Sequence, residues 1–557
     1  MLKKILYLPW LVWAFYRLIT WKLSVNKQLD VGNNHGRVSH PKFMSAAQAA
    51  TLIDPGSVLI VATLGGTGWA TAMFQAIAKR FRETDFSGGL TVLAIGGQGG
   101  RGMIPWSIDE LSRFPGLVKR FFSGHLETFR HTLKAAARGE IEVQCIPQGA
   151  FSRLIGMLAE GKKFFRTAAG IGTFADPRCG IGTCVANATK QWVEVTGHNK
   201  LRYTCPDPNV AIICATAVDK HGNVYVHNNA LLGEMRSAVL ATKRNGGKVI
   251  VQCGRIIEYC PDKIYIKAEL VDAVVVRPEA PQVICFTMNR PFRALTVGSR
   301  YSVDLALAIV GLINRVAGVT PKRGPQDDCL ARAAAWLISR VVKAGSNGNI
   351  GVGMPEVVAA WLARGGVMPG LNMIVESGPR GGVATSGVFF GDMIGPKELV
   401  ESWVAFKQIE EELDFAVLGA LEVDQYGNVN LSRRGEGPEG FVGPGGSTHI
   451  MHGAKTIVFV LRACDKKSGK SRFVEQVQEV TFSAEQALKA KKEVYYVTDC
   501  GIFQLTAHGL QLTHLMPGFT VEKIQSLVPF KFQVSDNLAE FGHDVATGQG
   551  FAPKLAA

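Results

Sequence analysis

Glu376 directly follows a predicted strand, at a position where a carboxylate contributes little to packing but can face a ligand. Residues 371–375 are typical of a buried strand, and the motif E-S-G-P follows at 376–379, with Gly381 and Gly382 just beyond. Ligands of open α/β sheets bind beyond the carboxyl ends of the strands, so this side chain should face a crevice. A carboxylate held there can act as a nucleophile, and glycines let the backbone approach a ligand closely. This placement makes Glu376 a candidate catalytic residue, and it makes Gly378, Gly381 and Gly382 candidates for the lining of a binding site.

A second glycine turn precedes this one in the sequence. The run NIGVGMPEVVAAWLA, at 349–363, predicts a strand, a turn at Gly351 and Gly353, and a helix that starts near Pro355. The first N–H groups of a helix have no partner within the helix, and they favour an anion. The pattern therefore predicts that Gly351 and Gly353 bind an anionic ligand.

The elements that must position these residues alternate between strand and helix. Residues 57–66 (SVLIVATLGG) and 90–100 (LTVLAIGGQGG) indicate buried strands that end in glycines, and residues 69–81 between them indicate a helix. Alternation of this kind is typical of an open, mainly parallel α/β sheet. The glycine turns then fall at one edge of the sheet, where a ligand would bind.

The chain repeats this pattern. VAIICATAVDKHGNVYV, at 210–226, matches FAVLGALEVDQYGNVNL, at 415–431, and the two aspartates, Asp219 and Asp424, lie 205 residues apart. We infer two homologous α/β domains in tandem, at 41–290 and 325–535, followed by a tail at 536–557. The linker at 291–324 contains an apolar stretch, 303–319, that predicts a helix packed between the domains.

Composition narrows the class of protein. The 557 residues are 47% hydrophobic and 19% charged, which excludes a disordered chain, and the net charge of +15 suits an anionic partner. The basic residues form no run with interleaved aromatics, so nucleic acid is not expected. Eleven cysteines without a C-x-x-C pair indicate reduced, buried thiols, and no set of residues has the spacing of a metal site.

The first 23 residues differ from the rest. Lys3 and Lys4 precede an apolar stretch that contains Trp10, Trp13, Tyr16 and Trp21, and no acidic residue occurs before Asp30. Tryptophan and tyrosine favour the membrane interface, and basic residues favour anionic lipid. Residues 1–22 therefore predict a membrane-surface contact, joined by a linker at 24–40 to a cytoplasmic enzyme at the inner face of the membrane. The alternative is a helix docked on another subunit or on the enzyme itself.

Several motifs together resemble one enzyme family. VESGPRGG (375–382), FGD (390–392) and GPGG (443–446) follow ATLGGTG (62–68) and IPQG (146–149). This ordered set resembles the family I CoA-transferases, of the propionate/acetoacetate (3-oxoacid) type that carries both halves in one chain. The resemblance implies that Glu376 is the nucleophile and that CoA is a substrate, with no bound metal or redox cofactor.

The resemblance also implies further properties of the site and the assembly. The oxyanions formed during acyl transfer need fixed donors, for which Gly65 and Gly66 are the candidates. Gln148 either orients the glutamate or the substrate carboxylate, or it is a loop side chain that caps the backbone. The five glycines from Gly351 to Gly382 that are named above become candidates for CoA binding. The expected substrates are an acyl-CoA and a carboxylic acid, with short-chain or 3-oxoacyl groups as in ketone-body and short-chain fatty acid metabolism, and the expected assembly is a homo-oligomer.

One segment departs from the family pattern. Glu410, Glu411 and Glu412 stand where these enzymes usually carry glycines beside the CoA site. Three carboxylates there would repel the CoA phosphates and raise the pKa of a nearby nucleophile. Either the segment points outward, or the site is remodelled. A remodelled site would favour an acyl-CoA hydrolase that uses the same glutamate, or an inactive membrane-associated protein that binds acyl-CoA.

Overall fold

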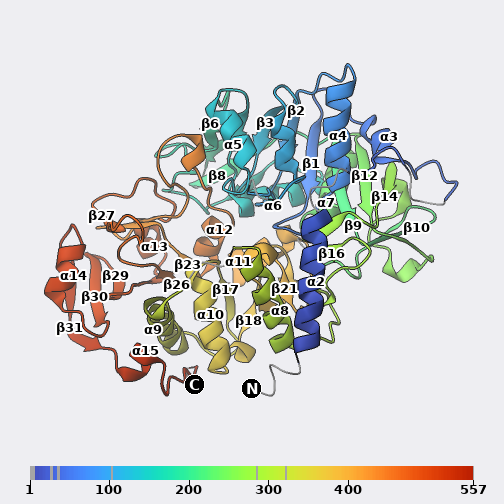
Figure 1. Cartoon of the computed structure of the whole chain (residues 1–557). Helices are drawn as coiled ribbons and strands as arrows, with labels where there is room; N and C mark the ends of the chain where they lie inside the picture. Colours follow the sequence, from blue (N-terminus) through green and yellow to red (C-terminus); the bar gives the residue numbers. More distant parts are fainter. Residues whose placement is uncertain are drawn as a thin grey trace.

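Each half of the chain forms a large, mainly parallel sheet covered by helices on both faces (Figure 1). The structure is a computed structural model that describes residues 7–24, 29–33, 38–101, 104–197, 199–283, 286–319 and 323–555. The predicted architecture of two α/β domains in tandem is confirmed.

The first sheet has eight strands, and only the pairing of the last strand is antiparallel. Its strands, in spatial order, are β14 (Ala273–Val276), β12 (Lys248–Cys253), β9 (Val210–Ala215), β1 (Val58–Ala62), β2 (Leu90–Leu93), β3 (Val118–Phe122), β4 (Glu142–Gln144) and β6 (Cys184–Ala186). Runs of valine, isoleucine and leucine make these strands apolar on both faces, so both faces need cover. The covering helices are α3 (Ala46–Ala50), α4 (Thr71–Glu83) and α5 (Arg130–Ala137) on one face, and α6 (Gln148–Ala159) and α7 (Met235–Arg244) on the other.

The second sheet also has eight strands, in the order β18 (Asn372–Met373), β17 (Asn347–Ile350), β23 (Phe415–Gly419), β26 (Thr456–Val460), β28 (Glu493–Val497), β29 (Gly501–Thr506), β30 (Gly509–Leu515) and β31 (Gln533–Glu540). The first five are parallel, and β29 and β30 form an antiparallel hairpin. Helices α9 (Pro325–Val341) and α10 (Met354–Arg364) cover one face, and α11 (Ser402–Glu412), α12 (Ser447–Gly453) and α13 (Ala484–Lys489) lie on the other. The last strand runs past residue 535, and α15 (His543–Thr547) packs on α9 in the predicted tail.

The internal repeat is visible in the topology. The order β14-β12-β9-β1-β2 in the first sheet corresponds to β28-β26-β23-β17-β18 in the second. The repeated aspartates close equivalent hairpins, β10 (Ala217–Asp219) to β11 (Val224–Tyr225) and β24 (Glu422–Asp424) to β25 (Val429–Asn430). Asp219 Oδ1 accepts the N–H groups of residues 221 and 223 at 2.8 and 3.1 Å, and Asp424 Oδ1 accepts those of 426 and 428 at 3.0 and 2.9 Å. The repeated motif is therefore a turn that stabilises the hairpin.

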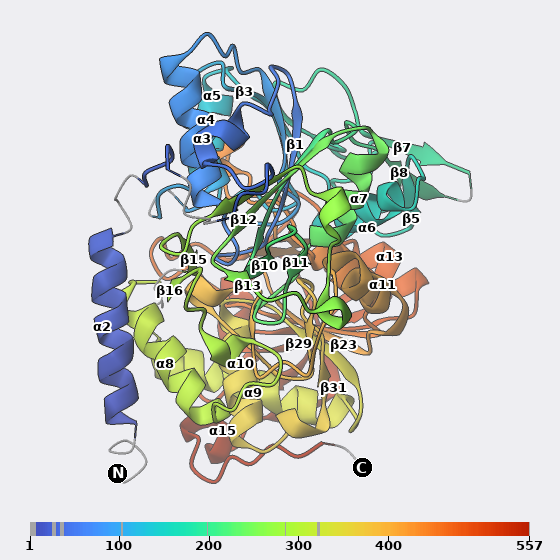
Figure 2. The same ribbon diagram turned by 90° about the vertical axis from the view of Figure 1, so that its right-hand side faces the viewer.

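Helix α2 (Leu8–Ser24) lies along α8 (Val303–Val316) at the edge of the molecule, as both views show (Figures 1 and 2). Ala14 and Leu18 of α2 are buried in this contact. The alternative that the N-terminal helix docks on the enzyme itself is thus realised, whereas Lys3 and Lys4 lie outside the described residues. Helix α8 contacts α2 and residues 387–394 of the second half, and the buried cluster that contains it also includes Ala230 of the first half. Leu307 on its other face is exposed, and the packing of α8 between the domains stays a prediction.

No helix of the described residues has both the length and the apolar character that crossing a bilayer requires.

Candidate active site

Glu376 lies in a tight turn just beyond the carboxyl end of β18. The N–H of Gly378 donates to the carbonyl of Val375 at 3.0 Å, and the Ser377 hydroxyl donates to the carbonyl of Gly391. Gly378 has φ of +116°, and a Cβ there would lie 1.9 Å from the carbonyl oxygen of Val400. Only glycine fits this position, so the turn that presents Glu376 depends on Gly378.

The environment of Glu376 perturbs its carboxyl group in two opposed ways. Burial raises the pKa of Glu376 above its ordinary value, and a hydrogen bond from the side chain of Asn349 opposes that rise. Asn349 is in β17, beside β18, and its Nδ2 also donates to the carbonyl of Ile374 at 3.0 Å. A desolvated carboxylate held by one amide is more basic than one in water, which favours nucleophilic attack.

The GPGG segment, residues 443–446, connects Glu376 to the first half of the chain. A Cβ on Gly446 would lie 3.3 Å from the carboxyl carbon of Glu376. The neighbouring Gly445 accepts the N–H of Gln148 at 3.0 Å and donates its own N–H to the carbonyl of Gly124 at 2.8 Å. The structure thereby brings together Glu376 and Gln148, two residues that sequence analysis selected from different halves.

Gln148 is suited to a role in the site. Its side chain is 2% exposed, and its Nε2 has no hydrogen-bond partner among the described residues. A buried amide donor without a partner costs free energy that a bound oxygen atom can restore. Gln148 begins α6, which packs closely on the second half: a Cβ on the next residue, Gly149, would lie 2.3 Å from Cγ of His449.

The two glycines of the first-domain loop approach the second domain very closely. A Cβ on Gly65 would lie 2.1 Å from the carbonyl oxygen of Phe390, and a Cβ on Gly66 would lie 2.7 Å from the carbonyl oxygen of Val388. The N–H of Gly65 donates to the carbonyl of Gly97 at 2.8 Å, so it is not available as an oxyanion donor in this conformation. No hydrogen bond of the Gly66 N–H is found in the part of the chain that the structure describes, which leaves Gly66 as the better candidate of the two.

The turn before α10 offers no free N–H group at the glycines that were predicted to bind an anion. Gly351 donates to the carbonyl of Val417 at 2.8 Å, and the N–H of Gly353 is bonded to the carboxylate of Glu356. A glutamate at the third helical position commonly caps its own helix in this way. Burial raises the pKa of Glu356 to about 7. Both N–H groups are thus engaged in this conformation, and anion binding by Gly351 and Gly353 stays a prediction.

The glycines after Glu376 serve close packing. The N–H of Gly381 donates to the carbonyl of Met373 at 3.3 Å, and the N–H of Gly382 points to the sulfur of Met393 at 2.9 Å. A Cβ on Gly382 would lie 2.3 Å from the carbonyl oxygen of Ile394. Contact of Gly378, Gly381 or Gly382 with CoA stays a prediction.

The three consecutive glutamates lie far from Glu376. Helix α11 starts beside the Glu376 turn, because the N–H of Val400 donates to the carbonyl of Gly378 at 3.1 Å, and it ends with the three glutamates. At a rise of about 1.5 Å per helical residue, they lie about 12 to 15 Å along α11 from Ser402. Glu411 and Glu412 are exposed at the end of α11, and Glu410 accepts the hydroxyl of Thr167 at 2.8 Å. Of the two readings of this segment, the structure supports the outward-pointing one.

Three residues near the site were not predicted from the sequence. Besides Asn349 these are His125, whose ring lies against Gly97, and Asp392, which accepts the Thr67 hydroxyl at 2.8 Å across the domain interface. Burial lowers the pKa of His125 to about 4 and raises that of Asp392 to about 7. Asn349 and Asp392 belong to runs already singled out, at 349–363 and 390–392, so position within those runs was an available signal. His125 offers none.

Comparisons with known proteins agree with this geometry. The sequence matches the coenzyme A transferase family over residues 43–277 and 332–527. It is 29% identical to the caffeate CoA-transferase of Acetobacterium woodii, over 90% of this chain and 96% of that protein, and 26% identical to the acetate CoA-transferase YdiF of Escherichia coli K12, over 88% and 91%. The crystal structure of the acyl-CoA transferase YdiF from E. coli O157:H7, in a thioester complex with CoA, superposes with a TM-score of 0.79 at 24% identity, over 92% of this chain and 97% of that one. With both halves in one chain, the protein belongs to the family I coenzyme A transferases.

Proposed function

We propose that the protein transfers CoA from an acyl-CoA to a carboxylic acid by way of a glutamyl-CoA thioester on Glu376. The observation that carries this proposal is the placement of Glu376. Its desolvated carboxyl lies beyond a strand end and next to Gly446, and the neighbouring Gly445 is hydrogen-bonded to Gln148. The Nε2 of Gln148 is buried and has no hydrogen-bond partner among the described residues. That E. coli YdiF forms a thioester complex with CoA lends support.

The first half of the reaction loads CoA onto the enzyme. The Glu376 carboxylate attacks the thioester carbonyl, the carbon–sulfur bond breaks, and the CoA thiolate leaves behind a mixed acyl–glutamyl anhydride. The thiolate then attacks the glutamyl carbonyl and releases the acyl group as its carboxylate. Charge develops on a carbonyl oxygen in each step, where Gln148 Nε2 and the Gly66 N–H are the proposed donors.

The second half reverses these steps with a new acid. The acceptor carboxylate attacks the glutamyl thioester, the thiolate leaves, and a new anhydride forms. Attack of the thiolate on the acyl carbonyl then yields the new acyl-CoA and restores Glu376. Over the whole cycle one thioester is broken and one is formed, and each step only exchanges a carbon–sulfur bond for a carbon–oxygen bond or the reverse, so no oxidant or reductant is needed.

The test is direct detection of the thioester. The protein is incubated with acetyl-CoA, with and without a carboxylate acceptor, and its intact mass is measured. A CoA adduct that maps to Glu376, and that disappears when acceptor is added, is the expected result. Glu376→Gln keeps the size of the side chain and should lose both adduct and exchange, whereas Glu411→Gln is the matched control and should keep both. Full activity of Glu376→Gln would refute the proposal.

Hydrolysis of acyl-CoA remains a possible outcome of the same assay, as acceptor-independent loss of thioester. Its support from sequence was the three glutamates, and these lie at the end of α11 that is remote from the Glu376 turn. Absence of both adduct and turnover would instead indicate a protein that only binds acyl-CoA. The acyl group is best sought in a panel from acetate to aromatic acids, because the relatives named above act on acetate and caffeate. A homo-oligomer, a cytoplasmic location and membrane contact stay part of the proposal.

A further inference from the structure

Helix α2 presents an apolar stripe to solvent along its whole length. Six side chains at spacings of three and four residues form this stripe and are 43–73% exposed: Leu8, Val12, Phe15, Tyr16, Ile19 and Leu23. The opposite face of the helix is buried against α8 through Ala14 and Leu18. The packing against α8 therefore does not use the stripe, and α2 contains no acidic residue.

Helix α8, which packs beside α2, also carries exposed apolar side chains. Val303, Leu307 and Val316 of α8 are exposed, as is Val297 just before it. Elsewhere in the described part of the chain, exposed large apolar side chains occur singly. A large exposed apolar patch on a protein surface indicates a site of contact with another protein or with a membrane.

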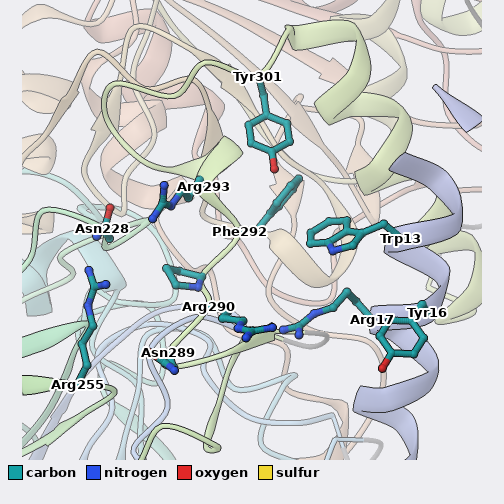
Figure 3. Close-up of a pocket in the computed structure, with 11 residues that line it drawn as sticks. Trp13, Tyr16, Arg17, Asn228, Arg255, Asn289, Arg290, Phe292, Arg293 and Tyr301 are labelled. Atoms are coloured by element: carbon teal, nitrogen blue, oxygen red, sulfur yellow. The ribbon is translucent and has the colours of Figure 1, made fainter. Parts of the chain in front are cut away.

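A cavity of about 440 Å³ lies between α2 and the loop at 289–293 (Figure 3). Its lining is rich in guanidinium groups and aromatic rings: Trp13, Tyr16, Arg17, Asn228, Arg255, Asn289, Arg290, Pro291, Phe292, Arg293 and Tyr301. Figure 3 shows the side chains of Arg17 and Arg290 pointing toward each other. Arg255, Arg290 and Arg293 form no ion pair with any residue that the structure describes. Like charges gathered around one cavity favour an anion within it.

The charge of this face distinguishes between two possible partners, a second copy of the chain and a lipid bilayer. Segments 8–24 and 286–319 contain six basic residues and one acidic residue, Asp304. In a symmetric dimer each patch would meet its own copy, so the arginines of the two subunits would repel each other. An anionic bilayer offers phosphates to the arginines and an apolar layer to the stripe, and tyrosine and tryptophan favour its interface.

We propose that the face formed by α2, α8 and the 289–293 loop docks on an anionic lipid bilayer, with the stripe in the interface and a headgroup phosphate in the arginine cavity. The helix lies flat, since α8 holds its inner face along its length. The contact is independent of the proposed transferase chemistry, because neither the stripe nor the cavity includes Glu376 or Gln148.

The first test measures sedimentation of the full chain with two kinds of vesicle, phosphatidylcholine alone and phosphatidylcholine mixed with phosphatidylglycerol. Binding to the anionic vesicles that falls with added salt is expected. Arg290→Glu/Arg293→Glu should weaken binding by at least about 25-fold, because each of the two basic residues near an anionic surface contributes a factor of about five. The control Lys119→Glu/Lys134→Glu changes the net charge equally on exposed residues of β3 and α5 and should bind as the wild type does.

The second test concerns the stripe. Phe15→Glu/Ile19→Glu should abolish binding, whereas Tyr426→Glu/Val534→Glu, which alters equally exposed apolar residues of the second half, should not. Equal binding to both vesicle types, or equal loss in the variants and their controls, would overturn the proposal. Binding of soluble CoA in the cavity, without binding of any vesicle, would also overturn the proposal. Such binding would be detected as an increase in the thermal stability of the protein with CoA that is absent in Arg290→Glu/Arg293→Glu. Transferase activity assayed in the same samples should be unchanged, which separates this proposal from the catalytic one.

Discussion

Replacing Gly446 with alanine tests whether this glycine sets the position of Glu376. The backbone at Gly446 has φ of −79° and ψ of −11°, which alanine adopts without strain. The added Cβ would lie 3.3 Å from the carboxyl carbon of Glu376 and 3.1 Å from the ring of Phe406. Ordinary contacts of such atoms begin near 3.4 Å, so one neighbour must move by a few tenths of an ångström.

Glu376 is the neighbour that should move. The Phe406 ring is completely buried in the core of the second domain, whereas Glu376 lies in a turn and is half-buried as a residue, although its carboxyl group is desolvated. A misplacement of about 1 Å at a reacting group can lower the rate about 100-fold, so we expect roughly a tenfold loss of kcat/KM, equivalent to about 1.4 kcal/mol. The loss should be in kcat and in the rate of adduct formation, with little change in KM. Stability should fall by about 1 kcal/mol.

The assay is single-turnover labelling of Glu376 by acetyl-CoA, followed by intact mass. Gly311→Ala in α8, where a Cβ meets no atom within 4 Å, is the control and should label at the wild-type rate. Shortening the buried ring by Phe406→Leu in the Gly446→Ala background should restore part of the rate. Wild-type labelling by a folded Gly446→Ala protein would show that Gly446 does not position the nucleophile.

Three further predictions concern charge. Activity should rise with pH through the raised pKa of Glu376, because the nucleophile must be ionised, and Asn349→Leu should move this limb to higher pH in a pH–rate profile; an unmoved limb would mean that the amide does not act on the carboxylate. Glu411→Gln/Glu412→Gln should change KM for acyl-CoA by less than about twofold, because these exposed charges lie at the remote end of α11, beyond a Debye length of about 8 Å, and a tenfold decrease would contradict their placement. The folded-state pKa of Asp392 is about 7 and its ordinary value is 3.8, so the stability gained from its protonated form is full below pH 3.8 and is lost as pH rises to 7. Relative to Asp392→Asn, the wild type should therefore lose up to about 4 kcal/mol of unfolding free energy across that range, measured by thermal or urea unfolding. A difference between the two proteins that does not change with pH would refute the pKa shift.

The repeated hairpins show how far sequence alone could lead. A Val-Asp-x-x-Gly-Asn-Val motif that occurs twice at a fixed distance requires the same local turn twice. In each hairpin the aspartate bonds backbone N–H groups within four residues. Apolar runs ending in glycines likewise indicated parallel strands, and both large sheets confirm them. Such features are local, so the sequence carries them.

The sequence by itself determined the two α/β halves and the choice of Glu376, because strand periodicity, glycine turns and an isolated carboxylate are written in neighbouring residues. The tertiary structure decided which groups meet. It placed Gln148 beside the loop that holds Glu376, used the N–H groups of Gly65, Gly351 and Gly353 in other bonds, and left the three glutamates at the end of α11 that is remote from the Glu376 turn. It also decided which face of α2 stays exposed. These outcomes depend on contacts between segments far apart in the chain, which no local pattern records.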